Sequence, residues 1–239
     1  MPLRIAFNDL AALRERCDMA VVRAADDDER EYEEGAVVPC GPWYSLTEEA
    51  GRELAAQPGT PPSTLVEVVR PPMPVGDALD DVATPMGDED AQYLGQALAK
   101  PGMLTTTDNY RDGRLIGLHL DNWDKLTYGR KPFGRRRLAL NLGPGTRYIV
   151  FGDLDAQAVC RAVHPRDHTR RHPHTDDYRR HVAAGSPVRC FRIRLEPGEG
   201  YIAPTEYLLH DGSTEGADKP SAVAFWLGRW PYGTLPSLV

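Results

Sequence analysis

The chain lacks the features that mark membrane, secreted and nucleic-acid-binding proteins. It contains no run of about 18 apolar residues, the length that a membrane-spanning helix needs. Its first residues, MPLRIAFNDLAAL, have neither the long apolar stretch nor the cleavage site of a signal peptide. Acidic residues outnumber basic ones, 35 to 28, and the net charge is −7, whereas nucleic-acid-binding domains usually have a basic excess. We therefore expect a cytoplasmic protein that binds neither membranes nor nucleic acids.

Cysteine and the common catalytic motifs are also scarce. The 239 residues include four cysteines, which lie far apart and form no CxxC pair. In a chain of this length we expect them to be reduced, partly buried thiols and not a disulfide framework. The glycine-rich stretch GPGTRY matches neither the Walker nor the Rossmann phosphate-binding pattern. The sequence also has no GxSxG elbow and no nucleophilic cysteine signature.

Residues 1–102 have the pattern of helices separated by proline- and glycine-rich connections. Apolar residues have helical spacing in 7–17, FNDLAALRERC. In 46–56, LTEEAGRELAA, Thr47 stands at the position of an N-cap and acidic residues fill the first turn. The segment 88–100, DEDAQYLGQALAK, begins with acidic residues and is followed by Pro-Gly, which predicts a third helix. We therefore expect a helical flank over this part of the chain.

Residues 103–239 have a different character. Short runs rich in β-branched and aromatic residues alternate with turns rich in Gly, Pro and Asp, and no long helix stands between most of them. The expected strands are 114–120, 136–142, 147–153, 188–195, 200–209 and 221–230. This pattern predicts an antiparallel sandwich or barrel. The chain has no internal repeat and no strong linker, so we expect one domain over 1–239.

One segment, 160–186, interrupts the β-rich half. It holds five of the seven histidines and many arginines. The histidine spacings fit no tight zinc pattern, and no cysteine accompanies them in a Cys/His array. We expect a mobile polar insertion that could act as a lid, or else a solvent-exposed helix without a chemical role.

The stretch GLHLDNWD contains two potential metal ligands inside an apolar run. His119 and Asp121 are two residues apart, so on a strand their side chains point to the same face. Two histidines and one carboxylate on one face of Fe(II) form the site of the non-haem iron oxygenases. His210, at the end of the apolar run EYLLH, is the candidate for the second histidine. A chance His-x-Asp pair on an ordinary strand is the competing interpretation.

The second half of the chain resembles the Fe(II)/2-oxoglutarate-dependent dioxygenases. The resemblance covers about residues 103–230 and is carried by HLD at 119–121, by HDGS at 210–213 and by PGEGYIAPTEYLLH, which is similar to the second motif of the cupin superfamily. It implies a mainly β fold with some helix, in which N-terminal helices flank a double-stranded β-helix (jelly roll) core. It also implies that His119, Asp121 and His210 bind Fe(II).

The same resemblance implies a reaction. With 2-oxoglutarate and O2, such an enzyme hydroxylates or otherwise oxidises a small molecule, such as an amino acid or natural-product intermediate, and forms succinate and CO2. The carboxylate of Asp121 favours hydroxylation over halogenation, because the halogenases of this superfamily have a small residue at this position. The alternatives are a cupin-type metalloprotein, an isomerase or a ligand-binding module, that does not use 2-oxoglutarate, and an interaction protein in which HLD is incidental.

The resemblance further implies a basic residue that pairs with the distal carboxylate of 2-oxoglutarate. Lys219 and Ser221 form a Lys-x-Ser sequence after His210, although Arg-x-Ser is commoner, and Lys219 could be a solvated loop residue. Arg229, at the end of an apolar strand, competes for this role, and Arg147 is a third option. Asn141 could contact the other end of the cosubstrate or close the GPG turn. The charged run 135–137 predicts a solvated strand edge, or an arginine for a substrate carboxylate.

Overall fold

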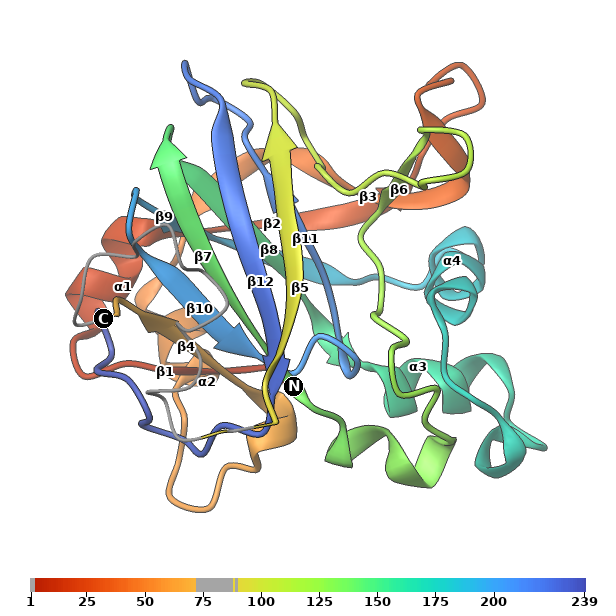
Figure 1. The fold of residues 1–239 in the computed structure, drawn as a ribbon. Coiled ribbons are helices and arrows are strands. Elements are labelled where there is room, and N and C mark those ends of the chain that lie inside the picture. The colour runs from red at the N-terminus through yellow and green to blue at the C-terminus, as the bar shows by residue number, and fades with distance from the viewer. Residues whose placement is uncertain (1–2, 72–87, 89) are drawn as a thin grey trace.

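The computed structural model describes residues 3–71, 88 and 90–239, which form two mixed six-stranded sheets (Figure 1). Across the first sheet the order is β1 (Arg4–Ala6), β4 (Leu65–Val69), β10 (Gly200–Ala203), β7 (Arg136–Pro144), β12 (Ser221–Gly228) and β5 (Gln92–Ala99). The β1–β4 pair is parallel and the other pairs are antiparallel. Strands from the beginning and the end of the chain therefore share this sheet.

The second sheet nearly closes on itself. Its order is β11 (Leu208–Ser213), β8 (Arg147–Asp155), β9 (Arg189–Leu195), β2 (Cys17–Ala24), β3 (Tyr32–Ser45) and β6 (Leu115–Gly117). The β3–β6 pair is parallel. Just after β6, His119 forms an isolated antiparallel bridge with His210 on β11, so the two outer strands meet again. We call this meeting point, formed by His119 and His210, the seam.

Helices cover the ends of the sheets (Figure 1). On one side lie α1 (Leu10–Arg16) and α2 (Glu48–Leu54), and on the other α3 (Ala156–Val163) and α4 (Thr175–Ala183), with 3-10 turns η1 (Pro62–Thr64), η4 (Tyr128–Phe133) and η5 (His168–Arg170). Both predicted helices 7–17 and 46–56 are confirmed, and the Thr47 hydroxyl accepts the Ala50 N–H as an N-cap. Within the described residues, no helix combines the length and the apolar character that crossing a membrane requires.

The core lies between the two sheets and continues behind the first one. Alternate residues of β12 point to opposite faces: Val223 belongs to the main cluster, whereas Ala224 and Trp226 belong to a second cluster. A strand that is buried on both faces has an almost continuous apolar sequence, as AVAFWLG does. The four cysteines are free thiols and three of them are buried, as the sequence predicted.

The predicted helix at 88–100 is wrong. Its residues form β5, which pairs with β12 from Gln92 to Ala99. Local helix preference in QALAK loses to this long pairing and to the contact of the Tyr93 ring with Trp226, with centroids 5.3 Å apart. The described part of residues 1–102 is therefore not a helical flank, because it supplies β1 to β5 as well as α1 and α2. The sheets are also mixed and not purely antiparallel.

Two further boundaries differ from the prediction. The expected strand 200–209 is two strands, β10 and β11, separated by a turn at 204–207, and each belongs to a different sheet. The segment 160–186 is neither a loose insertion nor a purely exposed helix: it contains the second half of α3 and all of α4. Tyr178 of α4 is fully buried and its hydroxyl donates to the Leu154 carbonyl at 2.7 Å. The many arginines and histidines of this segment did not indicate that one face of α4 is buried.

Candidate metal centre

The two predicted histidine ligands lie opposite each other at the seam. His119 and His210 exchange both backbone hydrogen bonds, at 2.9 and 3.0 Å. Their rings are consequently close, with centroids 4.6 Å apart, and both side chains are buried. The seam thus brings together two residues that are 91 positions apart (210 minus 119) in the sequence.

Each imidazole is oriented by a backbone carbonyl. Nδ1 of His119 lies 3.0 Å from the Gly117 oxygen, and Nδ1 of His210 lies 3.2 Å from the Leu208 oxygen. Because a carbonyl only accepts hydrogen bonds, Nδ1 carries the proton and the lone pair is on Nε2. Burial lowers the pKa of His210 to about 3, so this ring is neutral and able to coordinate a cation.

Asp121 completes the group. Its Oδ1 lies 3.9 Å from Nε2 of His119, and its Oδ2 lies 3.8 Å from Nε2 of His210. Burial acts to raise the pKa of Asp121, but the Arg137 guanidinium, 2.6 Å from Oδ2, and the two imidazoles outweigh it and hold the pKa at about 2. The carboxylate is therefore ionised beside the neutral imidazole of His210.

This arrangement fits a metal ion. One potential ligand atom from each of His119, Asp121 and His210 lies within 4.8 Å of the others. Nε2 of His210 is buried without a hydrogen-bond partner, although buried polar atoms are normally satisfied. A divalent cation bound between the three side chains would give this nitrogen a partner. The group can hold a metal through two histidines and one carboxylate.

The backbone around these ligands is held on several sides. Gly117 adopts φ +71°, and a Cβ there would lie 2.5 Å from the Val37 carbonyl oxygen, so only glycine fits between β6 and β3. Thr175, at the start of α4, uses its hydroxyl to accept from the Leu120 N–H at 3.1 Å and to donate to the Leu120 oxygen at 3.4 Å. The segment predicted to be a lid therefore fixes the peptide between two candidate metal ligands.

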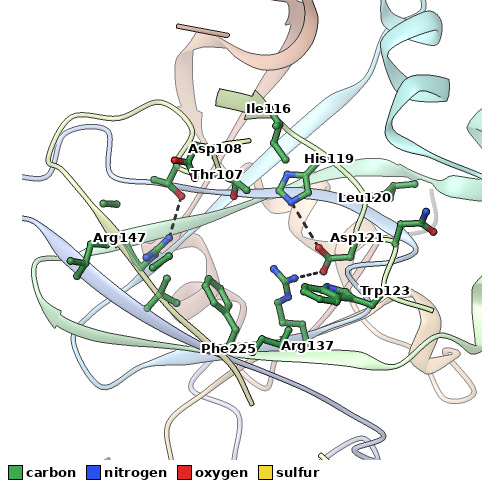
Figure 2. Close-up of a pocket in the computed structure, with 17 residues that line it drawn as sticks. Thr107, Asp108, Ile116, His119, Leu120, Asp121, Trp123, Arg137, Arg147 and Phe225 are labelled. Atoms are coloured by element: carbon green, nitrogen blue, oxygen red, sulfur yellow. Dashed lines mark hydrogen bonds and ion pairs between the residues drawn. The ribbon is translucent and has the colours of Figure 1, made fainter. Parts of the chain in front are cut away.

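A cavity of about 470 Å³ opens beside two of the candidate metal ligands, His119 and Asp121. Figure 2 shows His119 and Asp121 on its wall, with Arg147 at one side and Trp123 at the other. Apolar side chains, including Ile116 and Phe225, form much of the remaining lining. The indole of Trp123 is 51% exposed, which is high for a tryptophan. Such a cavity, apolar with a few polar groups, is typical of a small-molecule site.

Arg147 is the second notable feature of this cavity. It begins β8, is 5% exposed, and donates to the Thr106 hydroxyl at a long 3.4 Å. Its Nη1 has no hydrogen-bond partner, and no carboxylate of the described residues forms an ion pair with it. Burial accordingly lowers its pKa. A buried cation without a partner is costly, so the geometry favours an anionic ligand at this point.

Gly212 makes room for this guanidinium. A Cβ at Gly212 would overlap Nη2 of Arg147 and would lie 2.6 Å from the Thr106 hydroxyl. Gly212 is two residues after His210 on β11. Residues two apart on a strand lie on the same face and are about 6.6–7 Å apart. Arg147 therefore reaches across β11 to within one strand repeat of a metal ligand.

The other candidates from the sequence do not line the cavity. Lys219 is exposed in the loop before β12, and Ser221 is buried in β12. Arg229 is exposed and its guanidinium contacts the Phe133 carbonyl on a different part of the surface. Asn141 closes the GPG turn, because its amide donates to the Gly145 and Leu195 oxygens and its oxygen accepts the Gly143 N–H. The turn-closing interpretation of Asn141 thus has direct structural support.

The charged run 135–137 was misjudged as a solvated edge. Arg136 pairs with the buried Glu67 at 2.7 Å, and Arg137 pairs with Asp121 while its guanidinium lies over the Phe225 ring, 5.0 Å from the centroid. The sequence contained a signal for this: Arg136 and Arg137 directly precede the buried run LALNL, so they already belong to the strand.

The comparisons with known proteins give no family assignment. No protein-family model matches the chain, and no curated protein matches it.

Proposed function

We propose that this protein is an Fe(II)/2-oxoglutarate-dependent oxygenase that hydroxylates or otherwise oxidises a small molecule. One observation carries the proposal: two members of a buried group of two histidines and a carboxylate, His119 and Asp121, line the same cavity as a buried arginine that forms no ion pair with a carboxylate of the described residues. The first feature suits Fe(II) and the second suits the distal carboxylate of 2-oxoglutarate. Neither feature alone would favour an Fe(II)/2-oxoglutarate-dependent oxygenase over other metal-binding or anion-binding proteins.

The order of the strands supports a double-stranded β-helix. From β5 to β12, the chain visits the first and second sheets in the order first, second, first, second, second, first, second, first. A chain that alternates between facing sheets in this way supports the connectivity of a jelly roll; the antiparallel pair β8–β9 in the middle is joined through α3 and α4. We propose that β1 and β4 extend this core at the outer side of the first sheet, and that β2 and β3 are inserted between β9 and β6 in the second sheet.

In this proposal His119, Asp121 and His210 hold Fe(II). Bound iron supplies oxygen activation together with 2-oxoglutarate, and three protein ligands leave positions open for this chemistry. The backbone carbonyls of Gly117 and Leu208 keep each Nδ1 protonated, so each Nε2 is directed to the metal. Arg137 balances the charge of Asp121 and keeps its carboxylate in one orientation.

We assign the 2-oxoglutarate anchor to Arg147 and not to Lys219 or Arg229. Arg147 is buried, lines the cavity and can form two parallel hydrogen bonds to a carboxylate. The Thr106 hydroxyl, already 3.4 Å from Nη2, is a second polar group at this end. Arg147 lies across the cavity from Trp123 (Figure 2), so the side of the cavity beside the indole remains for the substrate, and Trp123 would shield it from water.

The test is an anaerobic titration with Fe(II) and 2-oxoglutarate. We expect the visible charge-transfer band of the chelate in wild type and its loss in His210→Ala. His181→Ala, in the helix α4, is the matched control and should keep the band. If wild type binds iron but gives no band, the cupin alternative without 2-oxoglutarate replaces the oxygenase. If wild type binds no iron, the proposal of a metal centre fails.

A further inference from the structure

A fully buried ion pair lies behind the carboxylate ligand. The side chains of Lys131, in η4, and Glu206, in the turn before β11, are 0% and 1% exposed, and their Nζ and Oε2 atoms are 3.6 Å apart. Taking two charges out of water costs several kcal/mol for each ion, and an apolar pair at such a place is often no less stable. Stability alone therefore gives no reason for this pair, and its contacts indicate another role.

Both charged groups touch the segment that carries Asp121. The Lys131 ammonium donates to the Asp121 carbonyl oxygen at 3.5 Å. Oε1 of Glu206 accepts the Asp124 N–H at 2.6 Å. The next residue back in the same turn, Thr205, uses its carbonyl to accept the Asp121 N–H at 3.0 Å. Both peptide groups that flank the Asp121 side chain are thereby fixed from the 204–207 turn and η4.

The same turn leads into the strand that carries His210. The 204–207 turn ends where β11 begins, and His210 is the third residue of β11. The pair thus joins the two separate chain segments that carry the carboxylate and the second histidine. The seam joins them on one side through the hydrogen bonds between His119 and His210, and the ion pair joins them on the other.

We propose that Lys131 and Glu206 are positioning residues that set the place of the Asp121 carboxylate relative to the two histidines. They do not touch the metal, and they act through the backbone of Asp121 and Asp124. Contacts of this kind around metal ligands typically change metal affinity by about 10–100-fold when they are removed. The inference rests on the proposed metal centre but requires neither 2-oxoglutarate nor turnover.

The decisive variant replaces both charges with side chains of similar shape. Lys131→Met/Glu206→Gln removes the ammonium and the ion pair, while the glutamine oxygen can still accept the Asp124 N–H. Lys131→Met/Glu206→Leu removes that hydrogen bond as well. In each double variant neither charge is left buried alone, which is the change that destabilises most strongly.

The molecule provides a matched control. Arg136 and Glu67 form another buried ion pair, 2.7 Å apart with side chains 4% and 3% exposed, which contacts none of the three metal ligands. Arg136→Met/Glu67→Gln makes the same chemical change there and keeps an acceptor for the Gly233 N–H. It should alter stability while leaving metal affinity within about twofold of wild type.

The measurement is the affinity for Fe(II) alone, without oxygen or 2-oxoglutarate, together with thermal unfolding of the metal-free proteins. We expect at least a 10-fold loss of affinity for the Met/Gln variant at Lys131 and Glu206, and a larger loss for the Met/Leu variant. Metal-free unfolding shows whether each variant is folded. If the folded variants bind Fe(II) as wild type does, the ion pair is merely structural and the inference is overturned. Failure of wild type to bind Fe(II) would instead contradict the proposed function.

Discussion

Replacement of Arg147 by methionine should have two effects of opposite sign. In the protein without cosubstrate, the guanidinium is buried with one long hydrogen bond and without an ion pair to a carboxylate in the described part of the chain. Methionine retains much of the apolar stem and removes the charge, so we expect the free energy of unfolding to rise by about 1 kcal/mol or more. For a chain of this size that raises the melting temperature by about 2–4 °C per kcal/mol.

The same replacement should nearly abolish 2-oxoglutarate binding. A guanidinium that forms two hydrogen bonds to the distal carboxylate contributes about 1.5–3 kcal/mol through each bond. Their sum, about 3–6 kcal/mol, corresponds to a loss of affinity of about 10²–10⁴-fold. Fe(II) affinity should stay unchanged, because Arg147 contacts none of the three metal ligands. Titration of the Fe(II) protein with 2-oxoglutarate and thermal unfolding without ligands measure the two effects separately.

Three companion variants make this test specific. Gly212→Ala keeps the arginine but places a methyl group where Nη2 of Arg147 now lies, so it should also weaken 2-oxoglutarate binding. Arg229→Met and Lys219→Met remove the two cations that the sequence favoured, and they should leave binding within about twofold of wild type. Wild-type affinity in Arg147→Met, or a large loss in either surface variant, would refute the assignment.

The remaining predictions concern the metal and the backbone around it. A chelator should lower the melting temperature of the iron-loaded protein by about 5–11 °C if iron was present at 100 times its Kd, since such binding contributes about 2.7 kcal/mol; His210→Ala should not respond. Gly117→Ala should lose more stability in urea than Gly113→Ala, because both glycines have positive φ but only the first Cβ meets backbone, and equal losses would contradict this. Thr175→Val should cost about 1–3 kcal/mol in urea unfolding, because the buried Leu120 N–H loses its acceptor, whereas Thr175→Ser should keep most of the stability.

Part of the fold was predictable because local pattern and tertiary structure agree. The Thr47 cap and the strands β7, β8, β9 and β12 follow directly from residue spacing and turn residues. The helix predicted at 88–100 failed because its residues favour a helix locally and only the pairing with β12 makes them a strand. In β3, which has 14 residues, internal glycines and prolines hide a strand whose length depends on its partner β2.

The candidate site divides in the same way. His119 and Asp121 are two apart on one extended segment, so the sequence alone places them together, and His210 needed only the expectation of a returning strand. The arginines could not be assigned this way. Arg147, Arg229 and Lys219 are all cations near the ends of β segments, and only burial and the space left by Gly212 single out Arg147. The tertiary packing around each cation, and not its position in the sequence, decides which one lies at the site.

The candidate metal centre lies where the second sheet closes, at the bridge between His119 and His210. Two backbone hydrogen bonds complete the ring of strands there, and a metal held by both imidazoles would tie the same two segments a second time. Metal binding would then also stabilise the closed arrangement of the strands relative to the open one. Without metal, the ring should open most readily at these two candidate metal ligands, and amide hydrogens at 119 and 210 should exchange faster than those inside β8 and β9. Metal binding and closure of the second sheet would then depend on each other.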